Sequence, residues 1–373
     1  MTAPLYGVET PAPLTAALLG VEHPHSAAHL RTLQQLPEVE RILLWDESAA
    51  ALTRIQEQQG DKVALATTEL DALLADEQLT CVIAALRNDL GPAIFLRVIA
   101  AGKHLMAEKP IGRIAADTLR VVEAARTAGV RLGVCYQNRA NAVVEEARRL
   151  VALGVIGPLM SLEMRMITTQ VRYRNPQHWL FSKEKAGGGI LSWLGCHYID
   201  LMRYMTQDEI VSVQAEVATR SGEAIDVEDS AALSLRFRSG AVGTLHAGYI
   251  LALSGGGYHN PAGYDTYVGL NGRHGRIYWS SNGSPYRLNV ESAAPAWAGA
   301  PKWEAEYTAG QSPAYGGKSG EIFMRRFFLS AQQGTPAWTR GEDALAVARI
   351  VDAAYESSRS GRRVEIEPLP IHA

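Results

Sequence analysis

Hydrophobic residues in the first third of the chain follow two patterns that alternate. Between residues 14 and about 134, short apolar runs typical of buried strands are separated by longer stretches in which apolar residues recur at helical spacing. The pattern predicts strands at residues 14–20, 41–46, 62–66, 80–85, 104–107 and 131–135, and helices at 26–36, up to 58, at 90–101 and at 115–128. Such alternation predicts a parallel sheet covered by helices on both faces, an architecture of nucleotide-binding proteins.

After about residue 137 the pattern changes. One helix is expected at 141–153, and strand-like stretches then dominate, at residues 159–168, 210–219, 231–237, 242–249, 264–270 and 276–279. Turns that contain glycine join several of these stretches, which favours a largely antiparallel sheet. A last helix is expected at 342–358, and the glycine-rich stretch 310–320 is interpreted as a mobile loop. The chain is therefore predicted to be an α/β protein with two domains, residues 1–136 and 137–373.

Composition narrows the class of protein. The chain has 373 residues, 47% of them hydrophobic and 20% charged, as in an ordinary soluble globular protein. Its net charge of −3 predicts no nucleic-acid partner and no anionic membrane, and no apolar run reaches the length of a membrane span or a signal peptide. Three widely spaced cysteines predict neither a disulfide framework nor a zinc motif, so we expect a cytoplasmic protein.

The tripeptide Glu108-Lys109-Pro110 is the first candidate site. It follows the predicted strand 104–107, and ligands of open α/β sheets bind at the carboxyl ends of strands. An ammonium group at Lys109 can donate to a substrate oxygen and stabilise a developing alkoxide. Glu108 can orient Lys109 or be a solvated carboxylate, and Pro110 is interpreted as structural.

Three segments together resemble the Gfo/Idh/MocA oxidoreductases, a family named for glucose–fructose oxidoreductase and inositol dehydrogenase. Residues 100–110 resemble its Glu-Lys-Pro segment, residues 187–200 its Gly-Gly-Gly…His-x-x-Asp segment, and residues 353–364 its C-terminal helix and strand. The resemblance covers the chain in order. It implies an N-terminal Rossmann domain, doubly wound, for NAD or NADP, and a C-terminal α/β domain with a large, mostly antiparallel open sheet.

The same resemblance implies a reaction and an assembly. In such enzymes the substrate lies between the domains, and hydride moves between a nicotinamide and a secondary alcohol, commonly of a sugar or polyol. The partner is then a small carbohydrate-like molecule, and the exposed sheet face makes a homodimer or homotetramer. Lys109 and His197 take the catalytic positions, with His197 as general base or acid, and Asp200 lies on the same helix face as His197.

Trp193 departs from the family pattern, because many members carry Asp at this position. An indole donates only through Nε1 and cannot act as a base. Three interpretations stay open: Lys109 and His197 suffice for a dehydrogenase, Trp193 forms an apolar platform for a sugar or the nicotinamide, or redox chemistry has been lost.

The phosphate-binding loop departs as well. Only Gly20 survives of the expected G-x-G-x-x-G, and Glu22 brings negative charge near phosphate unless it points away. His23 and His25 can donate to pyrophosphate at the start of the helix that follows. Together with His29 they match no standard zinc spacing, so no metal is expected. Asp46, at the end of the second strand, favours NAD over NADP because a carboxylate repels a 2′-phosphate.

Polar residues near the predicted cleft complete the candidate site. Gln137 and Arg139 suit sugar hydroxyls or a carboxylate, or reflect the polarity of a hinge; Arg172 suits an acidic or polyhydroxy ligand, or lies in a surface loop. The predicted catalytic residues are Lys109 and His197. The cofactor-binding residues are expected to be Gly20, His23, His25, Asp46, Glu108 and Lys109, and the substrate-binding residues Gln137, Arg139, Arg172, Trp193 and Asp200.

These observations together predict a nicotinamide-dependent oxidoreductase that acts on a sugar, polyol or carbohydrate derivative, with NAD as cofactor. Two alternatives remain at this point. One is an enzyme that keeps NAD bound and cleaves glycosides through transient oxidation, which a pocket containing Trp193 suits. The other is a non-redox homologue that binds dinucleotide or sugar, which the altered phosphate loop and the missing Asp suggest.

Overall fold

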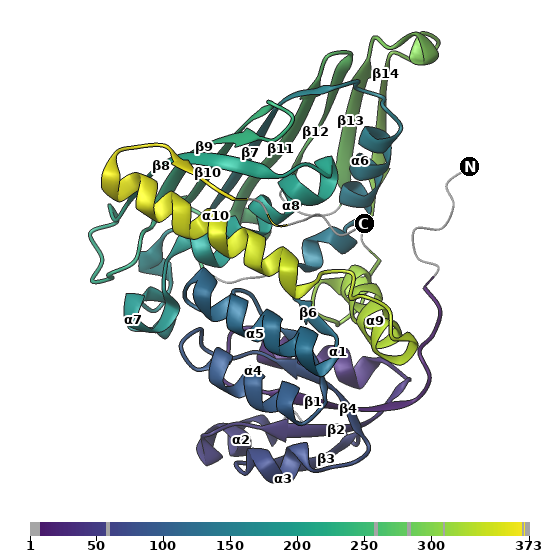
Figure 1. Cartoon of the computed structure of the whole chain (residues 1–373), viewed down its shortest axis with the longest axis vertical. Helices are drawn as coiled ribbons and strands as arrows, with labels where there is room; N and C mark the ends of the chain where they lie inside the picture. The colour runs from purple at the N-terminus through teal and green to yellow at the C-terminus, as the bar shows by residue number, and fades with distance from the viewer. Residues whose placement is uncertain are drawn as a thin grey trace. The chain divides into compact units, whose positions relative to one another are not determined.

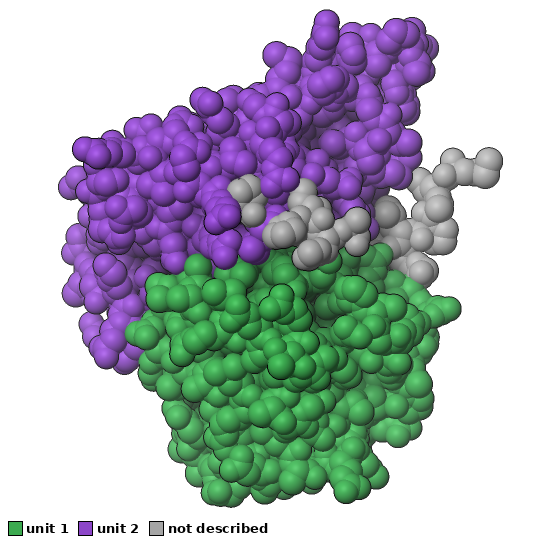
Figure 2. All heavy atoms as spheres, viewed as in Figure 1, with its two compact units in different colours: residues 1–140, 310–345 green, residues 141–309, 346–373 purple. Residues whose placement is uncertain are grey.

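The computed structural model describes residues 8–56, 60–256, 260–281, 285–308, 310–367 and 369. Packing groups the chain into two units, coloured separately in Figure 2. Unit 1 takes its residues from 1–140 and 310–345, and unit 2 from 141–309 and 346–373. The sequence predicts a single domain boundary at residue 136. In the structure the first unit extends to residue 140, and the chain rejoins it from residue 310 to residue 345.

Unit 1 contains a six-stranded parallel sheet in the order β3-β2-β1-β4-β5-β6 (Figure 1). Its strands are β1 (Leu14–Leu19), β2 (Val39–Trp45), β3 (Val63–Thr67), β4 (Leu79–Ala84), β5 (His104–Ala107) and β6 (Leu132–Val134). The helices are α1 (Ser26–Gln35), α2 (Ala49–Gln56), α3 (Leu70–Leu74), α4 (Gly91–Ala100) and α5 (Ala115–Ala128). Every residue of β1 is buried, as expected for a central strand covered on both faces. Strand order reverses between β1 and β4, which makes the carboxyl ends of these strands the expected ligand site.

A helix far along the chain completes the core of unit 1. Helix α9 (Gly317–Gln333) brings Phe323, Phe327 and Phe328 into the cluster that contains Leu18 and Leu30. The expected loop at 310–320 is wrong for its last residues, which form the first turn of α9. Gly316 and Gly317 have φ values of 81° and 65°, so they adopt a left-handed conformation where the helix starts rather than extending a loop.

Unit 2 contains a nine-stranded sheet in the order β14-β13-β12-β11-β7-β10-β9-β8-β15, antiparallel except for the pair β7–β10. Its strands are β7 (Leu159–Thr169), β8 (Ile210–Ala218), β9 (Ser230–Phe237), β10 (Val242–Leu251), β11 (Tyr264–Gly272), β12 (Gly275–Ser281), β13 (Tyr286–Ser292), β14 (Lys302–Tyr307) and β15 (Val364–Glu365). The helices are α6 (Ala142–Ala152), α7 (Lys183–Ala186) and α8 (Cys196–Thr206), and α10 (Gly341–Ser360) begins in unit 1 and continues in unit 2. The predicted α/β fold with one parallel and one mostly antiparallel sheet is confirmed.

The large sheet has one covered face and one exposed face. Buried and exposed residues alternate along β9 and β10, because successive side chains of a strand point to opposite sides. Helices α6 and α8 lie against the covered face (Figure 1). Within the described ranges, no helix is both long and apolar enough to cross a membrane.

Candidate functional site

The turn after β1 is built for close approach of backbone. Gly20 has a φ of 84°, and a Cβ at this position would overlap the carbonyl oxygen of Ala85 and lie 2.7 Å from Leu86 Cδ2. The Ser26 hydroxyl donates to the Gly20 carbonyl over 2.6 Å and ties the turn to the start of α1. One glycine of the fingerprint is therefore required by geometry here, and the N-terminus of α1, whose dipole favours an anion, follows it.

Asp46 holds this turn from the end of β2. Its Oδ2 accepts the N–H of Val21 over 2.8 Å, and its Oδ1 accepts the N–H of Ser48 over 2.9 Å. Each carboxylate oxygen keeps acceptor capacity for a ribose hydroxyl. Glu22, expected to be unfavourable near phosphate, forms an ion pair with Arg54, so its charge is compensated on the protein.

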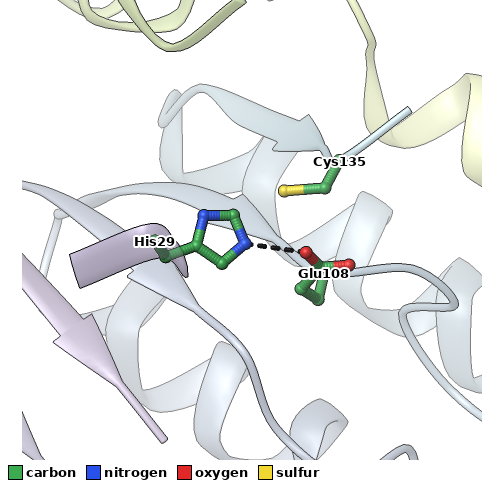
Figure 3. A group of neighbouring side chains, drawn as sticks. All are labelled: His29, Glu108 and Cys135. Atoms are coloured by element: carbon green, nitrogen blue, oxygen red, sulfur yellow. Dashed lines mark hydrogen bonds and ion pairs between the residues drawn. The ribbon is translucent and has the colours of Figure 1, made fainter. Parts of the chain in front are cut away.

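Glu108 follows β5 directly, and its carboxylate is contacted by several groups. Its Oε1 lies 2.7 Å from His29 Nε2 and 3.1 Å from His25 Nδ1, and its Oε2 accepts the N–H of Lys109 over 3.2 Å. Figure 3 shows the imidazole of His29 joined to Glu108, with the sulfur of Cys135 turned toward the same space. The sequence predicted Glu108 and His25 as site residues, but not that they meet.

Protonation in this group follows from burial and charge. Burial alone would raise the pKa of Glu108, but His25 and His29 outweigh it and hold that pKa well below its usual value. Burial lowers the pKa of His25 despite the nearby Glu108, and burial followed by His25 lowers the pKa of His23 well below its usual value. At neutral pH, Glu108 is therefore a carboxylate, and His23 and His25 are neutral imidazoles.

Lys109 is buried at the carboxyl end of β5. Only 1% of the residue is exposed, so Lys109 is not a solvated lysine on the surface. The peptide bond that joins it to Pro110 is cis. A lysine is almost never buried without compensation, and the Glu108 carboxylate is its chain neighbour.

Arg139 has a structural environment. Its guanidinium donates to the Trp338 carbonyl over 3.1 Å and forms an ion pair with Asp343 over 3.2 Å. Gln137 lies at the same turn, where a Cβ on Gly316 would come within 3.2 Å of its side-chain oxygen. These contacts tie the end of the first domain to the segment that returns after residue 310, and they favour the hinge interpretation for Arg139.

In unit 2 a buried carboxylate holds the run of three glycines at residues 187–189. Glu228 accepts the N–H of Gly189 over 2.8 Å, the N–H of Leu191 over 3.0 Å and the hydroxyl of Tyr355 over 2.9 Å. Its pKa is raised by burial, which these hydrogen bonds only partly offset. A Cβ on Gly189 would overlap the Glu228 carbonyl oxygen, so the glycine is required by packing.

The glycine run leads into the segment that carries the other candidate residues. Residues Leu191–Gly195 form a π-helical turn that continues into α8, a departure from α-helical geometry often found at functional sites. His197 is 8% exposed, and Asp200 is 1% exposed, on α8. Trp193 is 2% exposed, and its ring meets Trp179 edge-to-face at 6.0 Å.

Arg172, the remaining predicted ligand residue, is exposed. Its guanidinium donates to the Ala252 carbonyl over 3.1 Å and stacks on Tyr173. The neighbouring Arg174, by contrast, is partly buried, donates to the Thr168 hydroxyl and stacks on Tyr249. The surface-loop interpretation therefore suits Arg172.

Sequence reasoning missed four residues of these clusters: His29, Cys135, Glu228 and Tyr355. His29 lies four residues after His25 at the start of a helix, a spacing that places both side chains on one face. That signal was available from the sequence. The pairing of Glu228 with Gly189 was not, because the two lie 39 residues apart.

Comparison with known proteins gives two family matches and several relatives. Residues 15–136 match the family described as an oxidoreductase family with an NAD-binding Rossmann fold, and residues 144–278 match the GFO/IDH/MocA C-terminal domain. The chain is 26% identical over 209 residues to the 1,5-anhydro-D-fructose reductase of Ensifer adhaerens, across 56% of this chain and 62% of that protein. It is 27% identical over 204 residues to the levoglucosan dehydrogenase of Pseudarthrobacter phenanthrenivorans, across 48% of this chain and 52% of that protein. These alignments span less than two thirds of either relative.

A third relative aligns over nearly its full length, and solved structures share the fold. The D-apiose dehydrogenase of Paraburkholderia graminis is 25% identical over 366 residues, across 93% of this chain and 88% of that protein. A levoglucosan dehydrogenase in complex with NADH and L-sorbose superposes with a TM-score of 0.83 at 21% identity, covering 96% of this chain and 100% of that one. An oxidoreductase domain protein from Kribbella flavida gives 0.84 at 22% identity, covering 95% and 100%.

Proposed function

Because the chain belongs to the Gfo/Idh/MocA oxidoreductases, we propose that it is an NAD-linked dehydrogenase or reductase for a secondary alcohol of a sugar, polyol or carbohydrate derivative. The observation that carries the proposal is Lys109, which is buried beside a carboxylate at the carboxyl end of β5. Relatives named for 1,5-anhydro-D-fructose, levoglucosan and D-apiose support the substrate class.

The residues of unit 1 suit a dinucleotide. The Gly20 turn leaves no space for a side chain, and α1 begins soon after it, so the positive end of the helix dipole suits pyrophosphate. Neutral His23 and His25 can donate to phosphate oxygens, and Asp46 can accept from a ribose. The negative charge of Asp46 repels a 2′-phosphate, which favours NAD over NADP. The nicotinamide, when bound, supplies or accepts the hydride.

The chain's own chemistry then concerns one oxygen and its proton. Lys109 as an ammonium donates a hydrogen bond to the reacting oxygen and stabilises negative charge as it develops. His197 accepts the hydroxyl proton during oxidation, or returns it during reduction. Trp193 packs against Trp179 and offers no basic atom, so these two residues carry the proposal.

The test is a pair of substitutions with matched controls. Lys109→Met and His197→Gln should each lower kcat/KM by about 100-fold or more on a confirmed sugar substrate, the usual size of such contributions. NADH affinity, followed by energy transfer from tryptophan, reports separately whether the cofactor still binds. Lys103→Met is the control for the lysine, because Lys103 precedes β5 and donates to the Asp76 carbonyl. His274→Gln, in the turn between β11 and β12, is the control for the histidine.

Two outcomes would overturn this assignment. Full turnover in both Lys109→Met and His197→Gln would remove the proposed roles. Absence of NADH and NADPH binding by the folded protein would remove the redox reaction itself.

We also propose that the exposed face of the nine-stranded sheet joins copies of the chain into a homo-oligomer. The face carries a hollow of about 530 Å³, lined by β7–β11 and containing Arg165, His246 and Tyr267. Light scattering of the wild type should give a multiple of the chain mass. Ser234→Arg, whose cross-strand neighbours Gln214 and Thr244 are uncharged, should reduce it to one chain. An unchanged multimer in Ser234→Arg would locate the contact elsewhere.

The location of the protein in a reducing cytoplasm is part of the same proposal. Cys81, Cys135 and Cys196 are buried thiols that form no disulfide in the described part of the chain, as expected where thiols stay reduced.

A further inference from the structure

Four side chains of the kinds that bind transition metals converge in unit 1. Ala107 pairs with Val134 in the parallel register of β5 and β6, so the next residues, Glu108 and Cys135, are neighbours across the two strand ends. Helix α1 brings His29 to the same place, and one ligand atom from each of these three residues lies within 4.8 Å of the others. The three side chains point toward a common space in Figure 3.

His25 lies beside these three residues and contacts Glu108, but it is not part of the group whose ligand atoms all lie within 4.8 Å of one another. Its Nδ1 lies 3.1 Å from the Glu108 oxygen that His29 also contacts, and the two histidines are four residues apart at the start of α1. That spacing places two imidazoles on one side of a helix, as in helical zinc sites. The sequence alone does not reveal this group, because Glu108 and Cys135 follow strands β5 and β6, far along the chain from α1.

The separations are close to those of a coordination sphere. Zinc bonds of about 2.0–2.3 Å at tetrahedral angles put neighbouring ligand atoms about 3.3–3.7 Å apart. The His25–Glu108 separation of 3.1 Å is near this range, and the His29–Glu108 separation of 2.7 Å must open by about half an ångström. All four residues are at most 8% exposed, so their positions are fixed by packing.

We propose that His29, Glu108 and Cys135, with His25 next to Glu108, form a binding site for a divalent transition-metal ion of the zinc and cobalt class. Imidazole and thiolate select such ions, whereas magnesium and calcium prefer sites made of oxygen ligands. Coordination replaces the thiol proton of Cys135, and the N–H proton of a neutral His29 moves to Nδ1 when Nε2 binds the ion, so one proton passes to solvent for each ion bound. The proposal does not depend on the substrate of the proposed reaction, although His25 and Glu108 are also expected cofactor-binding residues.

The competing explanation is a hydrogen-bonded group that only fixes Glu108. His25 and His29 already stabilise the carboxylate, and burial followed by the Glu108 charge raises the pKa of the Cys135 thiol well above its usual value. In that case the cluster is complete without an ion, and added metal finds no sulfur ligand.

Cobalt titration of the full chain, stripped with chelator and desalted, separates the two explanations. We expect one Co²⁺ per chain, with the intense visible bands of a tetrahedral ion and a near-ultraviolet thiolate-to-cobalt charge-transfer band, both lost when Zn²⁺ is added. Cys135→Ser should abolish the charge-transfer band, and His29→Gln should weaken affinity by at least about 10–100-fold, the range for loss of a supporting group. Cys81→Ala, which removes another buried thiol of unit 1, should leave both unchanged.

The wild-type spectrum alone can overturn the proposal. If Co²⁺ in excess gives no charge-transfer band, Cys135 does not bind metal, whether or not the variants fold. A band that persists in a folded Cys135→Ser chain, as judged by circular dichroism, would place the thiolate ligand elsewhere. Either result leaves the hydrogen-bonded group as the account of this cluster.

Discussion

Alanine at Gly189 and alanine at Gly188 should have very different effects on the free energy of unfolding, although the two residues are adjacent. Neither has a positive φ, so the backbone itself tolerates a side chain, and the surroundings decide. The Cβ of Gly189→Ala would overlap the carbonyl oxygen of Glu228 and lie 2.9 Å from its carbonyl carbon. The Cβ of Gly188→Ala would instead overlap the hydroxyl of Tyr355, the end of a side chain.

The magnitudes follow from what must move. In Gly189→Ala, backbone has to separate from backbone, which strains the hydrogen bonds that Gly189, Ile190 and Leu191 donate to Glu228 over 2.8–3.0 Å. Overpacking of this kind costs about 1–3 kcal/mol, and each of the three weakened bonds adds about 1 kcal/mol, so a loss of about 4–6 kcal/mol is expected. In Gly188→Ala, Tyr355 can turn aside at the loss of one hydrogen bond, about 1–2 kcal/mol.

Tyr355→Phe makes the comparison a double-mutant cycle. It removes the atom that Gly188→Ala would meet, so the two changes together should cost at least about 1 kcal/mol less than their sum. With Gly189→Ala the costs should simply add, because the obstructing atoms there belong to the backbone of Glu228. Urea unfolding of all five variants and the wild type gives these energies, and hydrogen exchange over residues 187–195 locates the effect.

Two results would refute this reasoning. Equal destabilisation by the two alanines would mean that the backbone of Glu228 yields as readily as a side chain. Rescue of Gly189→Ala by Tyr355→Phe would mean that the tyrosine, not the carbonyl, is the obstacle.

Two further predictions concern unit 1. Burial, followed by the charge of Arg131, lowers the pKa of His104, whose Nδ1 accepts the Arg131 N–H over 2.9 Å. The unfolded state therefore binds more protons below about pH 6.5, and the free energy of unfolding should fall with acidification more steeply in the wild type than in His104→Asn; equal slopes in urea titrations between pH 5 and 7.5 would contradict this. Arg139→Ala removes the ion-pair partner of the partly buried Asp343 carboxylate. It should lower the free energy of unfolding, measured in urea, by about 2–4 kcal/mol while leaving substrate KM unchanged. Unchanged stability with a raised KM would return Arg139 to the substrate-binding role.

The sequence predicted the strands of unit 1 well, because a strand buried on both faces is a continuous apolar run. It missed α3, which at five residues is too short to show helical periodicity, and β14, where charged and half-buried residues alternate with no buried position. The start of helix α9 was missed because the glycines there are typical of a loop. These failures occur where burial is small or where a local signal points the other way. Strand β13 was also missed, although Leu288, Val290 and Ser292 are buried on it.

The candidate site divides along the same line. Lys109 was predictable because it ends a buried strand, and strand ends are where ligands of such sheets bind. The contact of His29 with Glu108 joins residues 79 positions apart, and no local pattern encodes it. Arg139 was misleading because an arginine at a strand end has the same composition whether it faces a ligand or a carboxylate such as Asp343.

The return of the chain to unit 1 after residue 310 sets the order in which the protein can fold during synthesis. The cluster around Leu18 and Leu30 includes Phe323, Phe327 and Phe328, so a nascent chain that ends at residue 140 lacks one wall of its core. Apolar surface on the six-stranded sheet therefore stays uncovered until residues 141–309 and helix α9 have left the ribosome. At about 5–20 residues per second this interval lasts on the order of ten seconds or more, which is the period in which the young chain depends most on chaperones.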